Sequence, residues 1–263
     1  MEPADHDRHD RLERERRVER EREFHDARFA KGDGRRRSSG FYDLAQSSQE
    51  RFSSWIQEIP TGSRVLELGC GPDSVAWDLW ERGVEVTGID ISATAIERAR
   101  EHAEERGIDP EFFRVDNAEA PNLTSDQFDV VIGSAILHHI DLGRALANIG
   151  RVLHPGGTGL FHEPLGRNPA INAYRRLTPS ERSADEHPLT RQDLELIERH
   201  FGVAEFEFFH LLSLAAFPLL KTRALVPVRD RLERADRLLL DRVPGLSTFA
   251  WVVLIRVRNQ KQC

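Results

Sequence analysis

The chain has 263 residues with a formal net charge of −7 and 39% hydrophobic residues, which is enough to bury one large core. The acidic balance argues against nucleic acid as the main partner, and two cysteines exclude a disulfide framework. No apolar run reaches the roughly 18 residues of a membrane-spanning helix, and no signal-peptide pattern opens the chain, so we expect a cytoplasmic protein.

The first part of the chain is highly charged. Residues 1–23 are nearly all Arg, Glu, Asp and His, and a segment of this kind cannot bury enough surface to offset its ordering entropy. Acidic residues nearly balance the arginines, so a nucleic-acid-binding arm is not expected. We predict a charged N-terminal helix or disordered arm over residues 1–40, followed by the main domain over residues 41–263.

A βαβ unit follows an amphipathic helix predicted over residues 49–59. Residues 64–68 are mostly apolar and end in the turn Gly69-Cys70-Gly71, which is typical of a strand entering a tight turn. A helical segment ends at Gly83, and the second apolar run, 84–89, ends in Asp90. This order of elements predicts a right-handed βαβ unit that holds a nucleoside.

The residues of this unit indicate which nucleoside it holds. Glycines let the backbone approach a ligand closely, and Asp90 at a strand end can accept hydrogen bonds from both ribose hydroxyls. Both features fit a dinucleotide and S-adenosylmethionine alike. The third position of G-x-G-x-x-G is however Ser74, and Glu67 precedes the glycines. A carboxylate there would repel a pyrophosphate but suits a sulfonium and an ammonium group.

The segment E-L-G-C-G resembles the first motif of the class I S-adenosylmethionine-dependent methyltransferases, commonly E/D-x-G-x-G-x-G. The sequence departs from that motif at Asp73, where the family has its third glycine and where a carboxylate brings negative charge near the carboxylate of the donor. The resemblance implies an α/β fold with a doubly wound, seven-stranded, mostly parallel sheet. It also implies S-adenosyl-L-methionine as cofactor, with Tyr42 in a flap over the methionine end.

The next elements continue the pattern. Ser92 is a predicted N-cap of a helix that ends at Gly107. A short strand over residues 112–115 closes on Asp116 and Asn117. In the family that the chain resembles, an acid at this point accepts a hydrogen bond from the adenine amino group, and Asp116 takes that role. A turn-forming Asp-Asn pair is the alternative.

Two further strands deliver polar side chains. Residues 128–133 form an apolar run, as expected for a strand covered on both faces, and lead into Leu137-His138-His139. A predicted helix over residues 141–153 and a Pro-Gly-Gly turn precede the strand 158–162, which ends at Glu163. L-H-H and L-x-P-G-G are similar to motifs of the same family, so the resemblance spans roughly residues 60–165.

The remaining chain is predicted to add a helical cap. Residues 165–189 are too long for a plain connection and lie at the ligand edge, and residues 210–248 replace what is a short hairpin in the simplest fold. Strands are expected over 203–209 and 249–257. The apolar part of 210–248 must be covered by the core, a partner subunit, a lipophilic acceptor or a membrane surface.

Methyl transfer is an in-line displacement, so catalysis rests on positioning the acceptor and removing its proton where it carries one. The candidate bases are Glu163, His139 and His138, with Glu163 the first choice on its strand and His139 ahead of His138. The alternative is that these groups hold loops by hydrogen bonds. Asp185-Glu186-His187 has no regular metal-ligand spacing, and no metal site is expected.

The sequence therefore predicts a methyltransferase acting on a small-molecule, lipophilic acceptor, most similar to the branch of ubiquinone and menaquinone methyltransferases. The alternatives are a nicotinamide-dependent oxidoreductase and a non-catalytic cofactor-binding module. The candidate cofactor-binding residues are Tyr42, Glu67, Gly69, Cys70, Gly71, Asp90, Ile91, Asp116, Asn117 and Ser134.

Overall fold

The computed structural model describes residues 3–31, 44–75, 77–220, 222–243 and 245–260. The predicted cofactor contact at Tyr42 lies outside the described residues.

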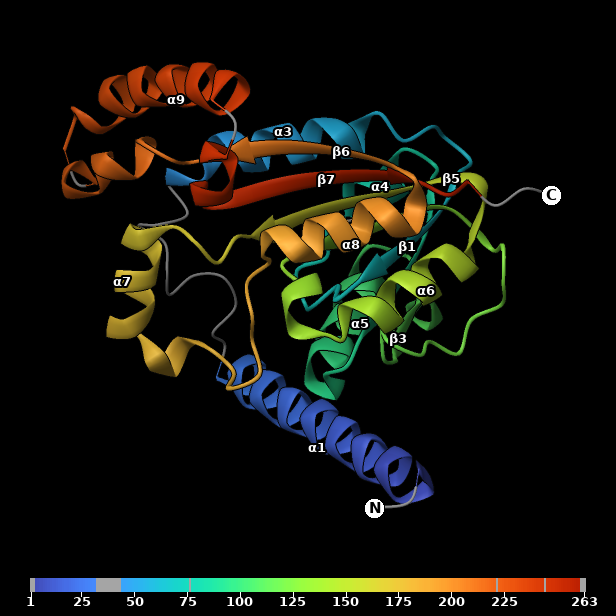
Figure 1. The fold of residues 1–263 in the computed structure, drawn as a ribbon. Coiled ribbons are helices and arrows are strands. Elements are labelled where there is room, and N and C mark those ends of the chain that lie inside the picture. The colour runs from blue at the N-terminus through green and yellow to red at the C-terminus, as the bar shows by residue number, and fades with distance from the viewer. Residues whose placement is uncertain (1–2, 32–43, 76, 221, 244, 261–263) are drawn as a thin grey trace.

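A seven-stranded sheet with the order β3-β2-β1-β4-β5-β7-β6 forms the centre of the molecule (Figure 1). All pairings from β3 to β5 are parallel, and β7 runs antiparallel to both β5 and β6. The predicted mostly parallel, doubly wound sheet is confirmed. The strands are β1 Arg64–Leu68, β2 Glu85–Asp90, β3 Phe113–Val115, β4 Phe128–Ser134, β5 Leu153–Pro164, β6 Val203–Phe209 and β7 Val252–Arg258.

Helices cover both faces of this sheet. The helices of the described chain, including those of the N-terminal segment and the cap, are α1 Pro3–Ala30, α3 Gln46–Gln57, α4 Trp77–Glu81, α5 Ala93–Glu105, α6 Leu142–Val152, α7 Pro169–Leu177, α8 Arg191–Phe201 and α9 Leu225–Arg242. Short 3-10 turns are η2 Pro110–Phe112, η3 Leu137–His139, η4 Pro179–Glu181, η5 Ser213–Leu219 and η6 Leu246–Phe249. No helix in the described part of the chain is long and apolar enough to cross a bilayer.

Alternation along the strands divides the core into two layers. In β1, Leu66 and Leu68 belong to the cluster that includes side chains of α6 and α8, whereas Val65 belongs to the cluster with Phe52 and Trp55 of α3. Successive strand side chains point to opposite faces, so a strand buried on both sides needs apolar residues at every position. The continuous apolar runs in the sequence have this origin.

Strand β5 is longer than predicted. It starts at Leu153, so the segment 154–157, expected to be a turn, lies within the strand. Phe128 pairs with Leu153 and Val130 with Thr158, so the register shifts there. Gly156, at φ +80°, takes a conformation that L side chains rarely adopt. The Pro-Gly-Gly signal therefore marks a bulge instead of the end of an element.

The cap has its own small core. Its buried members are Leu44, Ile171, Leu214, Ala216 and Leu225, drawn from the segment before α3 and from α7, η5 and α9. This cluster covers part of the apolar surface of 210–248. Phe217, Val226 and Leu238 stay 43%, 53% and 54% exposed, and contact of this surface with a membrane or a partner subunit remains a prediction.

The carboxylate of Asp236 fixes α9 to the start of η5. Asp236 is only 2% exposed, and it accepts hydrogen bonds from the backbone N–H groups of Leu211, Leu212 and Ser213 at 3.0, 2.6 and 3.1 Å. Three donors around one carboxylate compensate for the burial of its charge. The connection between β6 and β7 is thereby held in one arrangement.

The charged N-terminal segment forms α1, which lies beside α5 (Figure 1). A charged segment of this kind is expected to be solvated all round, but one face of α1 contacts the rest of the protein. Asp26 accepts hydrogen bonds from the Ser92 hydroxyl at 2.5 Å and from the N–H of Thr94 at 3.2 Å, at the first turn of α5. Arg20 forms a paired contact with Asp185 at 2.8 Å. Polar groups make this interface, so no apolar stripe in the sequence announces it.

Candidate active site

A cavity of about 850 Å³ lies at the carboxyl ends of β1, β2, β3, β4 and β5, between α1 and α7. In open α/β sheets, ligands bind at this edge. The predicted residues that line it are Gly69, Cys70, Gly71, Asp90, Ile91, Asp116, Asn117, Ser134, His138 and His139. Segments from five strand ends, the cap and the N-terminal helix thus meet around one space.

The glycine turn after β1 forms the floor of the cavity. Gly69 and Gly71 have φ of 64° and 57°, and a Cβ on Gly69 would lie 3.0 Å from Cδ1 of Ile136. The N–H groups of Gly69 and Cys70 donate to the carbonyl of Ile89 at 2.8 and 3.1 Å. Any side chain at Gly69 would strain the backbone and push the loop after β4. Because the two glycines carry no side chain, a ligand can approach the backbone of the turn closely.

Asp90 ends β2 beside this turn. Its Oδ2 accepts from the N–H of Gly71 at 3.0 Å and its Oδ1 accepts from the N–H of Ser92 at 2.8 Å. Burial raises the pKa of Asp90, and these backbone hydrogen bonds act against that shift. Each oxygen keeps lone-pair capacity for a further donor. The arrangement fits two adjacent hydroxyls of a ribose.

Glu67 takes a different position from the one predicted. Its carboxylate accepts hydrogen bonds from the Ser74 hydroxyl and from the N–H of Val75 at 3.1 Å, and it is not among the cavity-lining residues. It fixes the segment that follows the glycine turn. Asp73, the departure from the family motif, is exposed and lines the cavity. Asp73 thus places an acidic group on the cavity side, two residues after the glycine turn.

Asp116 follows β3 at the far end of the same cavity. Its Oδ1 accepts from the N–H of Asn117 at 2.8 Å and its Oδ2 from the N–H of Asn122 at 2.9 Å. Asn117 in turn accepts from the N–H of Glu119 at 2.9 Å. Both side chains thus organise a turn, as in the alternative interpretation, and both also line the cavity. The two roles are compatible because carboxylate oxygens accept more than one hydrogen bond.

A buried carboxylate and imidazole connect β5 with the loop after β4. Glu163 is fully buried, and its Oε1 accepts from the N–H groups of Ile136 and Leu137, both at 2.9 Å. Its Oε2 lies 2.7 Å from Nδ1 of His138. Burial raises the pKa of Glu163 to about 7 and lowers that of His138 to about 3. His138 is thus neutral, and when Glu163 is ionised the Nδ1–H of His138 faces the carboxylate, which leaves a lone pair on Nε2.

Glu163, the first-choice base on β5, does not itself line the cavity, whereas His162 does. Neighbouring strand residues point to opposite faces of the sheet, as expected. The prediction placed Glu163 on the cavity side, whereas His162 is the residue that faces the cavity. His162 Nε2 contacts the Ser48 hydroxyl at 3.1 Å, and that hydroxyl contacts Nε2 of His210 at 3.0 Å. Helix α3 thereby orients His162. Nothing in the local sequence distinguishes the two faces, because both are covered.

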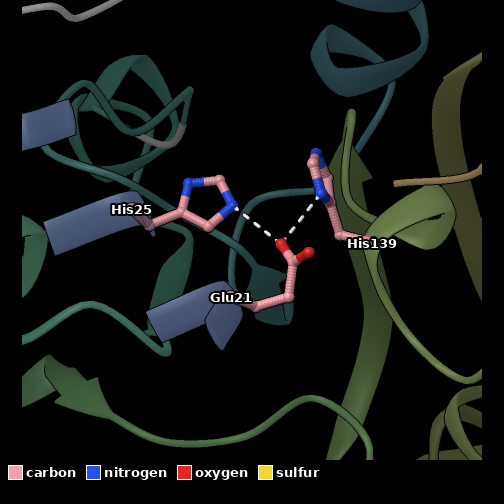
Figure 2. A group of neighbouring side chains, drawn as sticks. All are labelled: Glu21, His25 and His139. Atoms are coloured by element: carbon pink, nitrogen blue, oxygen red, sulfur yellow. Dashed lines mark hydrogen bonds and ion pairs between the residues drawn. The ribbon is translucent and has the colours of Figure 1, made fainter. Parts of the chain in front are cut away.

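Helix α1 supplies a wall that sequence reasoning missed. Figure 2 shows one carboxylate oxygen of Glu21 facing the rings of His25 and His139. Oε2 lies 3.1 Å from Nδ1 of His139 and 3.5 Å from Nε2 of His25. Burial acts to raise the pKa of Glu21, but the histidine contacts outweigh it and hold the pKa well below its usual range. The i,i+4 spacing of Glu21 and His25 was the only signal, in a segment that otherwise seemed uniformly charged.

Fold and site together define a class of protein. The strand order with one antiparallel strand, the glycine turn after β1 and the acid at the end of β2 are those of the class I methyltransferase fold. The plain dinucleotide-binding sheet does not have this antiparallel strand between its outer strands, which disfavours the nicotinamide alternative.

Comparison with known proteins agrees with the methyltransferase fold assigned from the strand order. Residues 65–157 match a family described as a methyltransferase domain. The ubiquinone biosynthesis O-methyltransferase of Aeromonas salmonicida is 35% identical over 109 residues, which cover 41% of this chain and 45% of that protein. The match thus spans less than half of that relative. Residues 65–157 thus match a methyltransferase domain and lie within a sheet that has the class I methyltransferase fold.

Two solved structures resemble the whole fold. One is the methyltransferase in the complex with the Haloferax volcanii Trm112 activator, with a TM-score of 0.62 and 18% identity over 90% of this chain and 98% of that one. The other is the [4+2]-cyclase SpnF, with a TM-score of 0.56 and 19% identity over 82% and 83%. SpnF is a cyclase, so this fold also supports chemistry other than methyl transfer.

Proposed function

We propose that this protein transfers the methyl group of S-adenosylmethionine to a small-molecule acceptor. The observation that carries the proposal is one cavity shared by a nucleoside-binding edge and a buried imidazole backed by a carboxylate. Asp90 would accept the ribose hydroxyls, Asp116 would face the adenine, and the backbone of the glycine turn would receive the methionine end. Bound there, the cofactor supplies an electrophilic methyl group.

The chain's own residues would prepare the acceptor. His138 is neutral at physiological pH, so the lone pair on its Nε2 can take a proton from an acceptor hydroxyl. Burial lowers its pKa and weakens it as a base, so the charge that forms needs the support of Glu163. Glu163, across the 2.7 Å contact to Nδ1, fixes the tautomer and stabilises the imidazolium that forms. Glu163 therefore acts through His138, as a positioning residue. Helices α1 and α7 wall the cavity and exclude water from the displacement.

The side chains that line the cavity also indicate the chemical class of the acceptor. On the cap side, Ile171, Tyr174 and Trp251 offer apolar and aromatic surface beside Arg175. Burial lowers the pKa of Arg175 to about 10, so its guanidinium stays charged. An acceptor with an apolar or aromatic body and a polar substituent fits these walls. The name of the Aeromonas relative, an O-methyltransferase, supports an oxygen nucleophile.

Calorimetry with S-adenosylhomocysteine and NAD tests the cofactor. We expect the full-length protein to bind S-adenosylhomocysteine but not NAD. Asp90→Asn should weaken binding by about 10- to 100-fold, since a hydrogen bond to a charged group contributes roughly 1.5–3 kcal/mol. Asp109→Asn, at an exposed turn where Asn caps equally well, is the matched control. Binding of NAD in place of the homocysteine would overturn the proposal.

Activity is tested by transfer of a labelled methyl group to a panel of hydroxylated aromatic and lipophilic compounds. We expect labelled product with at least one acceptor class and none from a His138→Ala variant that still binds S-adenosylhomocysteine. Tight cofactor binding with no transfer to any acceptor would instead favour the non-catalytic cofactor-binding alternative.

A further inference from the structure

Glu21, His25 and His139 form a compact group of metal-ligating side chains. Glu21 and His25 are one helical turn apart on α1, and His139 ends the 3-10 turn after β4. One ligand atom from each lies within 4.8 Å of the other two. Two segments more than a hundred residues apart in the chain thus bring two imidazoles and a carboxylate together (Figure 2).

The distances suit a shared ion. Two ligand atoms bound to one Zn²⁺ at about 2.1 Å in tetrahedral geometry lie roughly 3.4 Å apart. The contacts from Glu21 Oε2 to His139 and His25, at 3.1 and 3.5 Å, bracket that value. Two histidines and one glutamate are also a ligand set of catalytic zinc sites, which keep a fourth position open.

Burial separates this group from an ordinary surface cluster. Glu21 is 4% exposed, and the side chains of His139 and His25 are 11% and 18% exposed. The second oxygen of Glu21, Oε1, is buried and accepts no hydrogen bond of good geometry among the described residues, and the Ser183 hydroxyl interacts with the carboxylate only weakly, enough to lower its pKa. A buried carboxylate oxygen without a well-placed donor is costly, and a metal ion would satisfy it.

A neighbouring group, His138, His139 and Glu186, could compete for the same imidazole. His138 already contacts Glu163 through Nδ1, and Glu186 is less buried than Glu21. The Glu21 group has its ligand atoms in contact, so it needs the smaller rearrangement. All of its members line the cavity, so an open coordination position there would be accessible to an acceptor.

We propose that Glu21, His25 and His139 bind a divalent transition metal of the Zn²⁺ type, which holds the oxygen of the acceptor. This inference rests on the proposed methyl transfer and adds a ligand for the acceptor to it. Coordination lowers the pKa of the acceptor hydroxyl. The O–H bond breaks and its proton passes to His138; the oxygen then forms the O–CH₃ bond while the C–S bond breaks and leaves its electron pair on sulfur.

Metal titration of the full-length protein after treatment with a chelator tests the site. We expect one equivalent of Zn²⁺ by calorimetry and one of Co²⁺ with the visible absorption of a low-coordinate site. His25→Ala and the conservative Glu21→Gln should weaken binding more than about 100-fold, because loss of outer-shell partners alone costs 10- to 100-fold. His200→Ala, on the exposed end of α8, is the matched control and should bind normally.

Affinity for S-adenosylhomocysteine, measured on the same variants, separates the two proposals. Intact cofactor binding without stoichiometric metal would overturn the metal site and leave the proposed function standing. Metal binding without cofactor binding would overturn the proposed function, and with it the role of the ion in methyl transfer, and would leave only the metal site itself. Metal affinity that survives in His25→Ala but is lost in Glu186→Gln would assign the ion to the neighbouring group and overturn this assignment. Unchanged metal affinity in Glu21→Gln and His25→Ala would show that their contacts only hold α1 in place.

Discussion

His210 should make the protein sensitive to acid. It is 1% exposed, its rings contact the hydroxyls of Ser48 and Ser213, and burial lowers its pKa to about 3. In the unfolded chain a histidine has a pKa of about 6.5. Between these two values the unfolded state binds a proton that the folded state does not. Stability is therefore complete above about pH 6.5 and falls as pH decreases towards 3.

The size of the effect follows from the two pKa values. At pH 5 the solution is about 1.5 pH units below the pKa of the unfolded histidine, whereas the folded group binds almost no proton, so proton binding favours the unfolded state by about 2 kcal/mol. His210→Asn removes this titration. Asn suits the site's backbone because φ is 64° there, and Asn tolerates the left-handed region better than most residues.

Urea unfolding followed by tryptophan fluorescence at pH 7.5 and pH 5 measures the difference. The wild type should lose about 2 kcal/mol more than His210→Asn between these two pH values. Other groups, including the buried His138, titrate equally in both proteins and cancel. His200→Asn, on an exposed position, should lose as much as the wild type. Equal losses in His210→Asn and the wild type would refute the argument that His210 is buried in its neutral form.

Two further changes test the site and the cap. Glu163→Gln places an amide beside Nδ1 of His138, which favours the tautomer with the proton on Nε2. Turnover should therefore fall roughly 10²- to 10⁴-fold, with the affinity for S-adenosylhomocysteine unchanged. An unchanged turnover would show that His138 is not the base. Asp236→Ala leaves three backbone N–H groups without their acceptor and should lower the free energy of unfolding by on the order of 3 kcal/mol in urea titrations. Asp241→Ala, on the exposed face of the same helix, should have little effect; equal losses would show that the hydrogen bonds of Asp236 do not matter.

The sheet and the helix ends were predictable because their causes are local. Ser92 caps α5 by accepting from the N–H of Ala95, as predicted. A capping box formed by Thr190 and Asp193 begins α8 in the same way. Caps and turns depend on residues three or four positions apart, which a single sequence displays directly.

When both faces of a strand are covered, the local sequence does not show which face a given side chain occupies. His162 and Glu163 differ only in which layer each meets, and both layers are formed by distant segments. The packing of α1 against the domain could not be predicted from the sequence either, because its contacts join residues far apart in the chain, such as Arg20 and Asp185. Hydrophobic periodicity predicts faces that bury apolar groups and has no counterpart for an interface made of charges.

That charged interface has a consequence for how ligands enter and leave. Dissolved ions weaken attraction between partly exposed charges such as Arg20 and Asp185, whereas the apolar cluster under α7 and α9 depends little on ionic strength. Raising the salt concentration should thus loosen one wall of the cavity and leave the opposite one in place. Ligands should therefore enter and leave the cavity faster as the salt concentration rises.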